Sequence, residues 1–166
     1  MMAEKGFGGT FMWNRKRSVT LSLTVCFLFV TILTVALFVG PYAVKWWFIL
    51  YRGWSETKPA LAEMMVVFKW CFYPSAVFAY IALYSLIKLL FNIKKDHIFI
   101  AQNVKYLRII SWCCFGVASI TLVCGILYIP YLAIFIAAAF VGILLRVVKN
   151  VMHNAVEIRE ENELTI

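Results

Sequence analysis

Four long apolar stretches, almost free of charge, restrict this chain more than any other sequence feature. They cover about residues 19–40, 64–88, 109–129 and 131–152. About 20 helical residues are enough to cross the ~30 Å hydrocarbon core of a bilayer. Unpaired backbone amides are costly in lipid, so only helices or closed barrels can cross it. Because none of the stretches alternates apolar with polar residues, we predict four transmembrane helices.

The overall composition agrees with lipid as the solvent for these stretches. Of the 166 residues, 64% are hydrophobic and 14% are charged. A soluble domain of this length cannot bury so much apolar surface, because small folds expose a large share of their area. We therefore predict an all-α, polytopic membrane protein. Residues 1–166 are expected to form a single four-transmembrane-helix bundle, with a cytosolic stalk and tail at 153–166.

The distribution of Lys and Arg predicts the orientation in the membrane. Short cytosolic segments retain an excess of these residues. The segment before residue 19 and the segment 88–108 are rich in them, whereas the connection at 129–131 carries no charge. Both termini and the 88–108 segment are therefore predicted to be cytosolic. Topology also accounts for the net charge of +8, so we expect the bilayer, and no direct nucleic acid, as the partner of these cations.

Aromatic residues gather at the predicted membrane boundaries, which their apolar rings and polar edges favour. The predicted interfacial anchors are Trp46, Trp47, Trp54 and Trp70. Most of the apolar residues in the range 43–54 share one helical face, so we expect a short helix lying on the external surface there. A ligand-binding aromatic box is the alternative for the same rings.

No group of residues indicates catalysis or a bound cofactor. The four stretches contain no Asp or Glu, the residue type on which proton-coupled transport usually depends. Both histidines, His97 and His153, lie outside the stretches, so neither haem ligation nor another metal site is predicted. The five cysteines form no C-x-x-C pair and are interpreted as small apolar residues. We expect a protein that is not an enzyme.

Hydroxyl-bearing and small residues mark particular helix faces. Four threonines in the first stretch fall within an arc of about 80° on a helix. They are Thr20, Thr24, Thr31 and Thr34. Such hydroxyls either line a polar path or bond within and between helices. Small residues that predict close helix packing, or association of several copies, are Gly116, Ser119, Ala138 and Gly142.

Two segments on the predicted cytosolic side resemble a known family. The segment IFIAQNVKYLR at 98–108 is similar to the F-T-x-x-N-V-x-x-L-R signature of the domain-of-unknown-function 2975 family, with Ile100 in place of threonine. The ending REENELTI at 159–166 resembles its closing R-E-E-N-D-L-T-I/V, with Glu163 in place of aspartate. The family contains small bacterial four-helix membrane proteins, so the resemblance implies a multi-pass protein of the bacterial cytoplasmic membrane. Its members are often encoded beside a small Cro-like helix-turn-helix protein, which implies a DNA-binding regulator as partner.

The leading functional hypothesis is a membrane-embedded regulatory partner that binds a small cytosolic helix-turn-helix transcription regulator. The predicted interaction face consists of Phe99, Asn103, Lys105, Arg108, Glu160, Glu161, Asn162 and Leu164. One alternative is a small-molecule transporter or channel component that uses the threonine stripe. Another is an immunity or peptide-resistance membrane protein whose Trp-rich external segment intercepts a toxin.

Overall fold

A computed structural model describes the backbone of residues 7–53 and 59–164 and the side chains of residues 17–53 and 59–162. The helices are α1 (Phe7–Arg52), α2 (Pro59–Lys94), α3 (Ala101–Leu127) and α4 (Pro130–Leu164). All four are long and apolar enough to cross a membrane. The described residues contain no strand. The predicted all-α, polytopic class is thereby confirmed.

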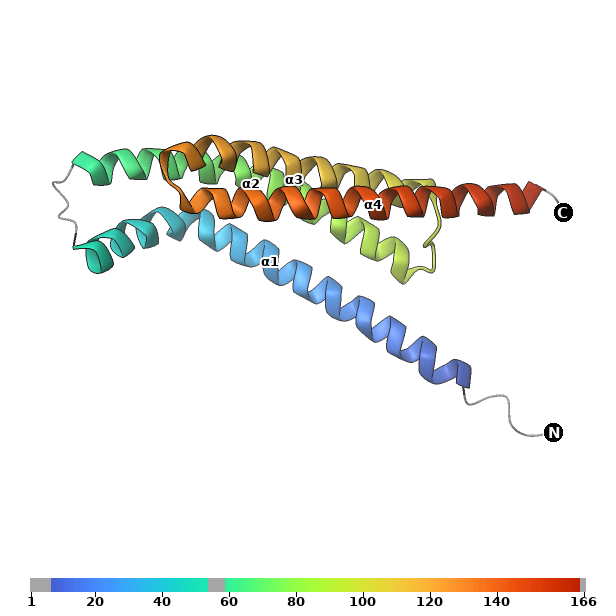
Figure 1. Cartoon of the computed structure of the whole chain (residues 1–166). Coiled ribbons are helices and arrows are strands. Elements are labelled where there is room, and N and C mark those ends of the chain that lie inside the picture. Colours follow the sequence, from blue (N-terminus) through green and yellow to red (C-terminus); the bar gives the residue numbers. More distant parts are fainter. Residues whose placement is uncertain (1–6, 54–58, 165–166) are drawn as a thin grey trace.

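Each helix packs on the next one in the chain. Helix α2 packs between α1 and α3, and α4 packs against the other side of α3. Within the described ranges, the backbone of α1 contacts neither α3 nor α4. The bundle is therefore open, and the amino-terminal part of α1 diverges from the other three helices (Figure 1). The α2–α3 loop and the carboxyl end of α4 lie together at one end, which we call the α2–α3 end.

Helix α3, which packs between α2 and α4, is the most buried of the four helices. In its apolar segment 39% of the residues are buried, against 6% in α1 and in α4. Its buried residues recur at three-to-four spacing, as a helix that packs on its neighbours requires. The buried apolar residues of α3 are Val104, Leu107, Ile110, Cys113, Ala118 and Cys124.

Two of the glycines predicted to allow close packing do lie at helix contacts. A Cβ atom on Gly116 would stand 2.8 Å from the Phe78 ring of α2. A Cβ atom on Gly142 would stand 3.3 Å from the Cβ atom of Cys114 on α3. Ser119, by contrast, is exposed, and its hydroxyl donates to the Phe115 carbonyl of the preceding turn at 2.9 Å. Glycine thus brings α3 close to both α2 and α4.

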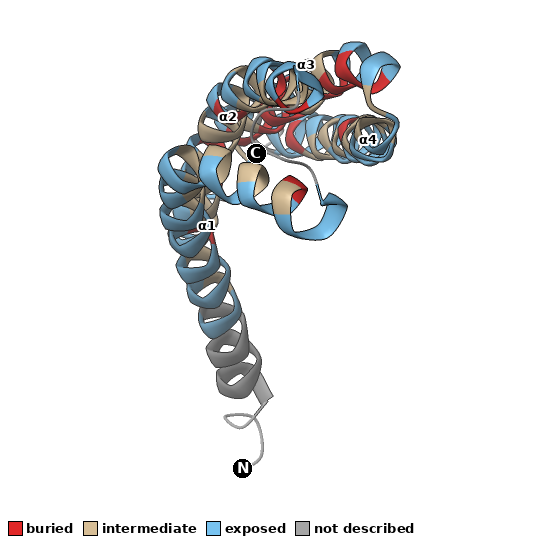
Figure 2. Ribbon diagram, turned by 90° about the vertical axis from the view of Figure 1, so that its left-hand side faces the viewer, coloured by how far each residue is buried: buried red, intermediate tan, exposed pale blue. Residues whose placement is uncertain are grey.

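Helix α1 contacts its neighbour along one narrow face. Its buried and half-buried residues from 17 to 40 recur every three or four positions, and the rest of its surface is exposed (Figure 2). That exposed surface is strongly apolar. It includes Leu21, Phe27, Leu28, Phe29, Ile32, Val35, Phe38 and Val39. Lipid is the solvent that accommodates such a surface, because none of the described helices covers it.

Helix α1 also continues through the segment for which a separate surface helix was expected. It contains Pro41 and runs without a break to Arg52. Proline lacks the amide proton for the helical bond and bends a helix. Figure 1 shows α1 bending in its last part, where the Phe48 ring lies 6.4 Å from that of Tyr128 beside the α3–α4 turn. The predicted helix of residues 43–54 is therefore the bent end of α1, and residue 54 lies outside the described residues.

Candidate functional site at the α2–α3 end

The carboxyl end of α2 is closed by a Schellman motif. The His97 amide donates to the Asn92 carbonyl at 3.0 Å, and the Asp96 amide donates to the Ile93 carbonyl at 3.1 Å. These two bonds satisfy carbonyls that the end of a helix leaves without partners. The motif requires a left-handed backbone conformation at the residue before the last donor. That residue is Asp96, which has a φ of 62°. The chain therefore leaves α2 in a fixed direction.

Asn103, in the first turn of α3, joins this motif to the start of the next helix. Its side-chain amide donates to the carbonyls of His97 at 2.8 Å and Ile98 at 2.7 Å. Its side-chain oxygen accepts a bond from the Asn92 amide at 2.8 Å. The side chain has no exposed surface. Because one buried residue of α3 satisfies groups on α2 and in the loop, the loop is held as a single unit.

The left-handed residue of this loop gives a first testable prediction. Asp96→Val should lower the free energy of unfolding by about 1–2 kcal/mol, because a β-branched residue is strained at positive φ. Asp96→Gly is the matched control, since it removes the same carboxylate but adopts this φ without strain. Unfolding of the two variants in mixed micelles measures the difference. Equal stability of the two variants would contradict a left-handed conformation at residue 96.

The structure places the predicted interaction residues in three separate situations. Phe99 in the loop is 44% exposed, and Lys105 and Arg108 on α3 are exposed. Asn103 is fully buried, so the prediction that it belongs to an accessible face is wrong for the folded chain. Its polar groups are used to hold the loop. The exposed residues from α4 are Glu160, Glu161 and Asn162, and the side chain of Leu164 lies outside the described residues.

The carboxyl end of α4 extends beyond α3. The Ser111 hydroxyl donates to the Gly142 carbonyl at 2.9 Å, which fixes the register of the two helices. Ala101, ten residues before Ser111, therefore lies opposite about residue 152, which is ten residues after Gly142. The last described buried residue of α4 is Val156. The following turns project from the α2–α3 end as an exposed helix and do not fold back over the loop (Figure 1).

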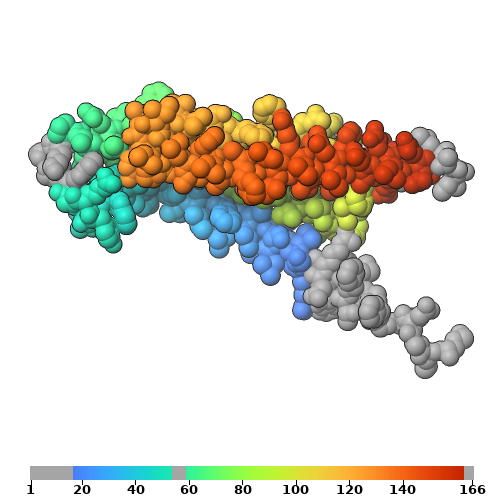
Figure 3. Space-filling model, in the orientation of Figure 1, coloured from blue at the N-terminus to red at the C-terminus, as the bar shows by residue number. Residues whose placement is uncertain are grey.

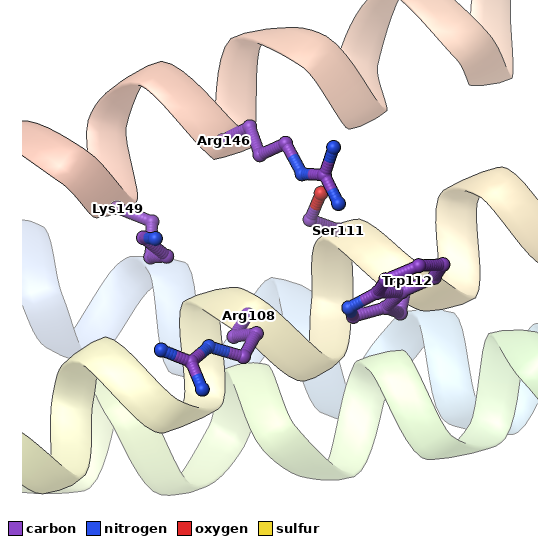
Figure 4. A pocket seen from close by; sticks show the side chains of 5 residues that line it. All are labelled: Arg108, Ser111, Trp112, Arg146 and Lys149. Atoms are coloured by element: carbon purple, nitrogen blue, oxygen red, sulfur yellow. The ribbon is translucent and has the colours of Figure 1, made fainter.

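A group of cations on α3 and α4 forms a pocket that the sequence interpretation missed. The pocket has a volume of about 130 Å³ and is lined by Arg108, Ser111, Trp112, Arg146 and Lys149 (Figure 4). The guanidinium of Arg146 lies over the ring of Trp112 at 5.2 Å from the centroid. One feature of the sequence could have indicated the pocket. Arg108 and Lys149 are the same number of residues from the α3–α4 turn, so two antiparallel helices bring them to the same level.

The opposite end of the molecule carries the aromatic residues predicted as anchors. Trp46, Trp47 and Trp70 are exposed there, whereas Trp54 lies outside the described residues. The Trp47 ring stacks on Tyr51, with 4.1 Å between centroids. A mainly apolar pocket of about 220 Å³ lies behind these rings. Its lining residues are Val44, Trp47, Phe48, Met64, Val67, Phe68, Tyr128, Pro130, Tyr131 and Ile134.

Bonds within the helix account for most of the threonine stripe. Thr24, Thr31 and Thr34 each donate a hydroxyl to the carbonyl four residues earlier, at 2.8–3.0 Å. Thr34 also bonds the Tyr80 hydroxyl of α2 at 2.8 Å. Hydroxyls that bond in this way join helices and satisfy their own polarity. The stripe therefore gives no support to a polar path through the membrane.

Figure 3 shows the face on which α4 lies in front of the other helices, with its carboxyl end extending past them. Four apolar helices and a structured polar end define the chain as a multi-pass membrane protein. The chain belongs to the family of proteins of unknown function DUF2975, which matches residues 49–166. It is similar to the uncharacterized membrane protein YoaS of Bacillus subtilis (strain 168), with 25% identity covering 92% of this chain and 99% of that protein. No solved structure matches it.

Proposed function

We propose that this chain is a membrane-embedded regulatory partner that binds a small helix-turn-helix transcription regulator at its α2–α3 end. The orientation that this requires follows from the positive-inside rule. The α2–α3 end carries exposed cations on three elements, whereas the α3–α4 turn has none. Examples are Lys88 on α2, Lys95 in the loop and Lys105 on α3. With this end in the cytosol, both chain termini are cytosolic.

The observation that carries the proposal is the exposed end of α4. Its described residues after Val156 project beyond α3 and include the acidic side chains of Glu157, Glu160 and Glu161, all exposed. A DNA-binding regulator presents a basic surface to its operator. An acidic helix at the membrane complements such a surface, which steers association and gives specificity. Phe99, exposed in the fixed loop, supplies an apolar contact at the same end.

The mechanism is sequestration. A regulator bound through its basic surface is held at the membrane, and its free concentration near DNA falls. A change in the membrane or in the outer part of the protein acts on this equilibrium only if it alters the affinity for the regulator. The bonds of Asn103 hold the loop that carries Phe99, and the bond from Ser111 to Gly142 joins α3 to the helix that carries the acidic residues.

The test is binding of the neighbouring helix-turn-helix regulator to the full-length protein in nanodiscs at several salt concentrations. The double variant Glu160→Lys/Glu161→Lys should weaken binding by about tenfold or more, because it reverses two charges that face the partner. Glu63→Lys, an exposed change near the start of α2, is the control and should leave the affinity unchanged. The proposal would be refuted if the wild type bound no regulator at any salt concentration, or if the double variant bound it as tightly as the wild type.

A further inference from the structure

The cationic pocket between α3 and α4 brings together positive charges from two helices. Arg108 comes from α3, and Arg146 and Lys149 come from α4 (Figure 4). Among the described residues, none of these three cations forms an ion pair with an acidic side chain. Like charges around one small pocket repel each other, and the repulsion grows where lipid lowers the dielectric constant. Such a pocket is stabilised by an anion.

The pocket is also preorganised. The Arg146 guanidinium lies 5.2 Å from the centroid of the Trp112 ring and 5.4 Å from that of Phe115. Aromatic rings hold a guanidinium in place by cation–π attraction. The side chain therefore loses less conformational entropy when a ligand binds. The bond from Ser111 to the Gly142 carbonyl fixes the spacing of the two helices at this level. That bond uses the only Ser111 proton, so the ligand is held by the cations.

The position of the pocket along the helices indicates where in the membrane its ligand lies. Arg108 stands 19 residues before Leu127, the end of α3, and Lys149 stands 19 residues after Pro130, the start of α4. At 1.5 Å per residue, both cations lie about 28 Å from the α3–α4 turn. This distance is close to the ~30 Å thickness of the hydrocarbon core. Both cations therefore lie at the depth of the headgroups of one leaflet.

We propose that this pocket binds the phosphate of an acidic phospholipid in the leaflet at the α2–α3 end. Guanidinium groups match phosphate oxygens with paired, charge-assisted hydrogen bonds. An acidic lipid supplies a net negative charge, which a zwitterionic lipid does not. The lipid is favoured over a soluble anion because the cations lie at the depth where the bilayer itself supplies headgroup phosphates.

Lipid titration of the purified, delipidated protein in neutral detergent tests the proposal by native mass spectrometry. The wild type should bind phosphatidylglycerol in preference to phosphatidylcholine. Arg108→Gln/Lys149→Gln should lower that preference by about tenfold or more, since two charge-assisted contacts are lost. Lys95→Gln/Lys105→Gln is the matched control, because it removes two exposed charges from the same end outside the pocket. Arg108→Lys/Lys149→Arg keeps both charges and should retain the preference.

Two further measurements on the wild type keep the result independent of variant folding. A photoreactive phosphatidylglycerol should label the parts of α3 and α4 that line the pocket. Millimolar inorganic phosphate should leave lipid binding unchanged.

Labelling confined to other helices, or an equal loss of preference in the Lys95→Gln/Lys105→Gln control, would overturn the proposal. Displacement of the lipid by inorganic phosphate would overturn the assignment to lipid and identify a site for soluble phosphate. No regulator is present, so the proposed function is not tested by these experiments.

Discussion

Asn103→Ala should lower the free energy of unfolding by about 3 kcal/mol, because it removes three side-chain hydrogen bonds at about 1 kcal/mol each. The bonds join the side chain to Asn92, His97 and Ile98. The residue is fully buried, so water cannot easily replace its amide. A variant that leaves these part-buried carbonyls without donors also incurs part of their desolvation penalty. Unfolding in mixed micelles of neutral detergent and dodecyl sulfate measures the change.

A graded series makes this prediction specific. Asn92→Ala removes one of the three bonds and should cost about 1 kcal/mol. Gln102→Ala changes the exposed neighbouring residue and should stay within about 0.5 kcal/mol of the wild type. Hydrogen exchange should also accelerate at the His97 amide in Asn103→Ala, because the loop loses the residue that joins it to α3. A cost for Asn103→Ala as small as that of Gln102→Ala would show that the loop does not depend on this residue.

Gly116→Val should destabilise the fold by about 2–3 kcal/mol through steric overlap between α2 and α3. A Cβ atom at this position would lie 2.8 Å from Cε1 and 3.0 Å from Cδ1 of Phe78. Atoms of the added side chain can be accommodated only if the ring or the helix moves. Close-packed interiors resist such movement. The same unfolding assay detects the loss.

A second substitution tests whether the contact with Phe78 is the cause. Phe78→Ala removes the ring, so the double variant Gly116→Val/Phe78→Ala should be more stable than the sum of the two single changes predicts, by about 1–2 kcal/mol. Gly40→Val is the matched control in α1. A Cβ atom on Gly40 meets Phe72 at an ordinary 3.5 Å, so this change should cost about 1 kcal/mol or less. Strict additivity at 116 and 78 would exclude the steric explanation.

The candidate site was partly predictable because charge is visible in the sequence. Exposed charged and apolar residues such as Phe99, Lys105 and Glu160 stand out between or after apolar runs. Asn103, an uncharged polar residue in the same segment, was predicted to belong with them, yet the structure buries it. A polar residue next to a helix start can contact a partner or hold its own loop, and only the positions of Asn92, His97 and Ile98 distinguish these roles.

The cationic pocket was predictable only in part, because equal distances of Arg108 and Lys149 from the α3–α4 turn do not show which sides of the two helices face each other. Arg146 and Lys149 look like residues that extend toward headgroups from the end of a long apolar helix. Their proximity to Arg108 depends on the register of α3 and α4, which the bond from Ser111 to Gly142 fixes. Neither the sequence of α3 nor that of α4, taken alone, shows how the two helices are aligned.

By itself, the sequence determined the number and type of helices and the need for lipid around them, because hydropathy over about 20 residues is a local property. Tertiary structure alone decided the open bundle, the continuation of α1 through Pro41, the burial of Asn103 and the pocket of cations. The reason is that these helices are apolar on nearly all sides. A helix without a distinct polar face does not show which of its sides meets a neighbour, so rotation and register arise only from the packing of one helix on another.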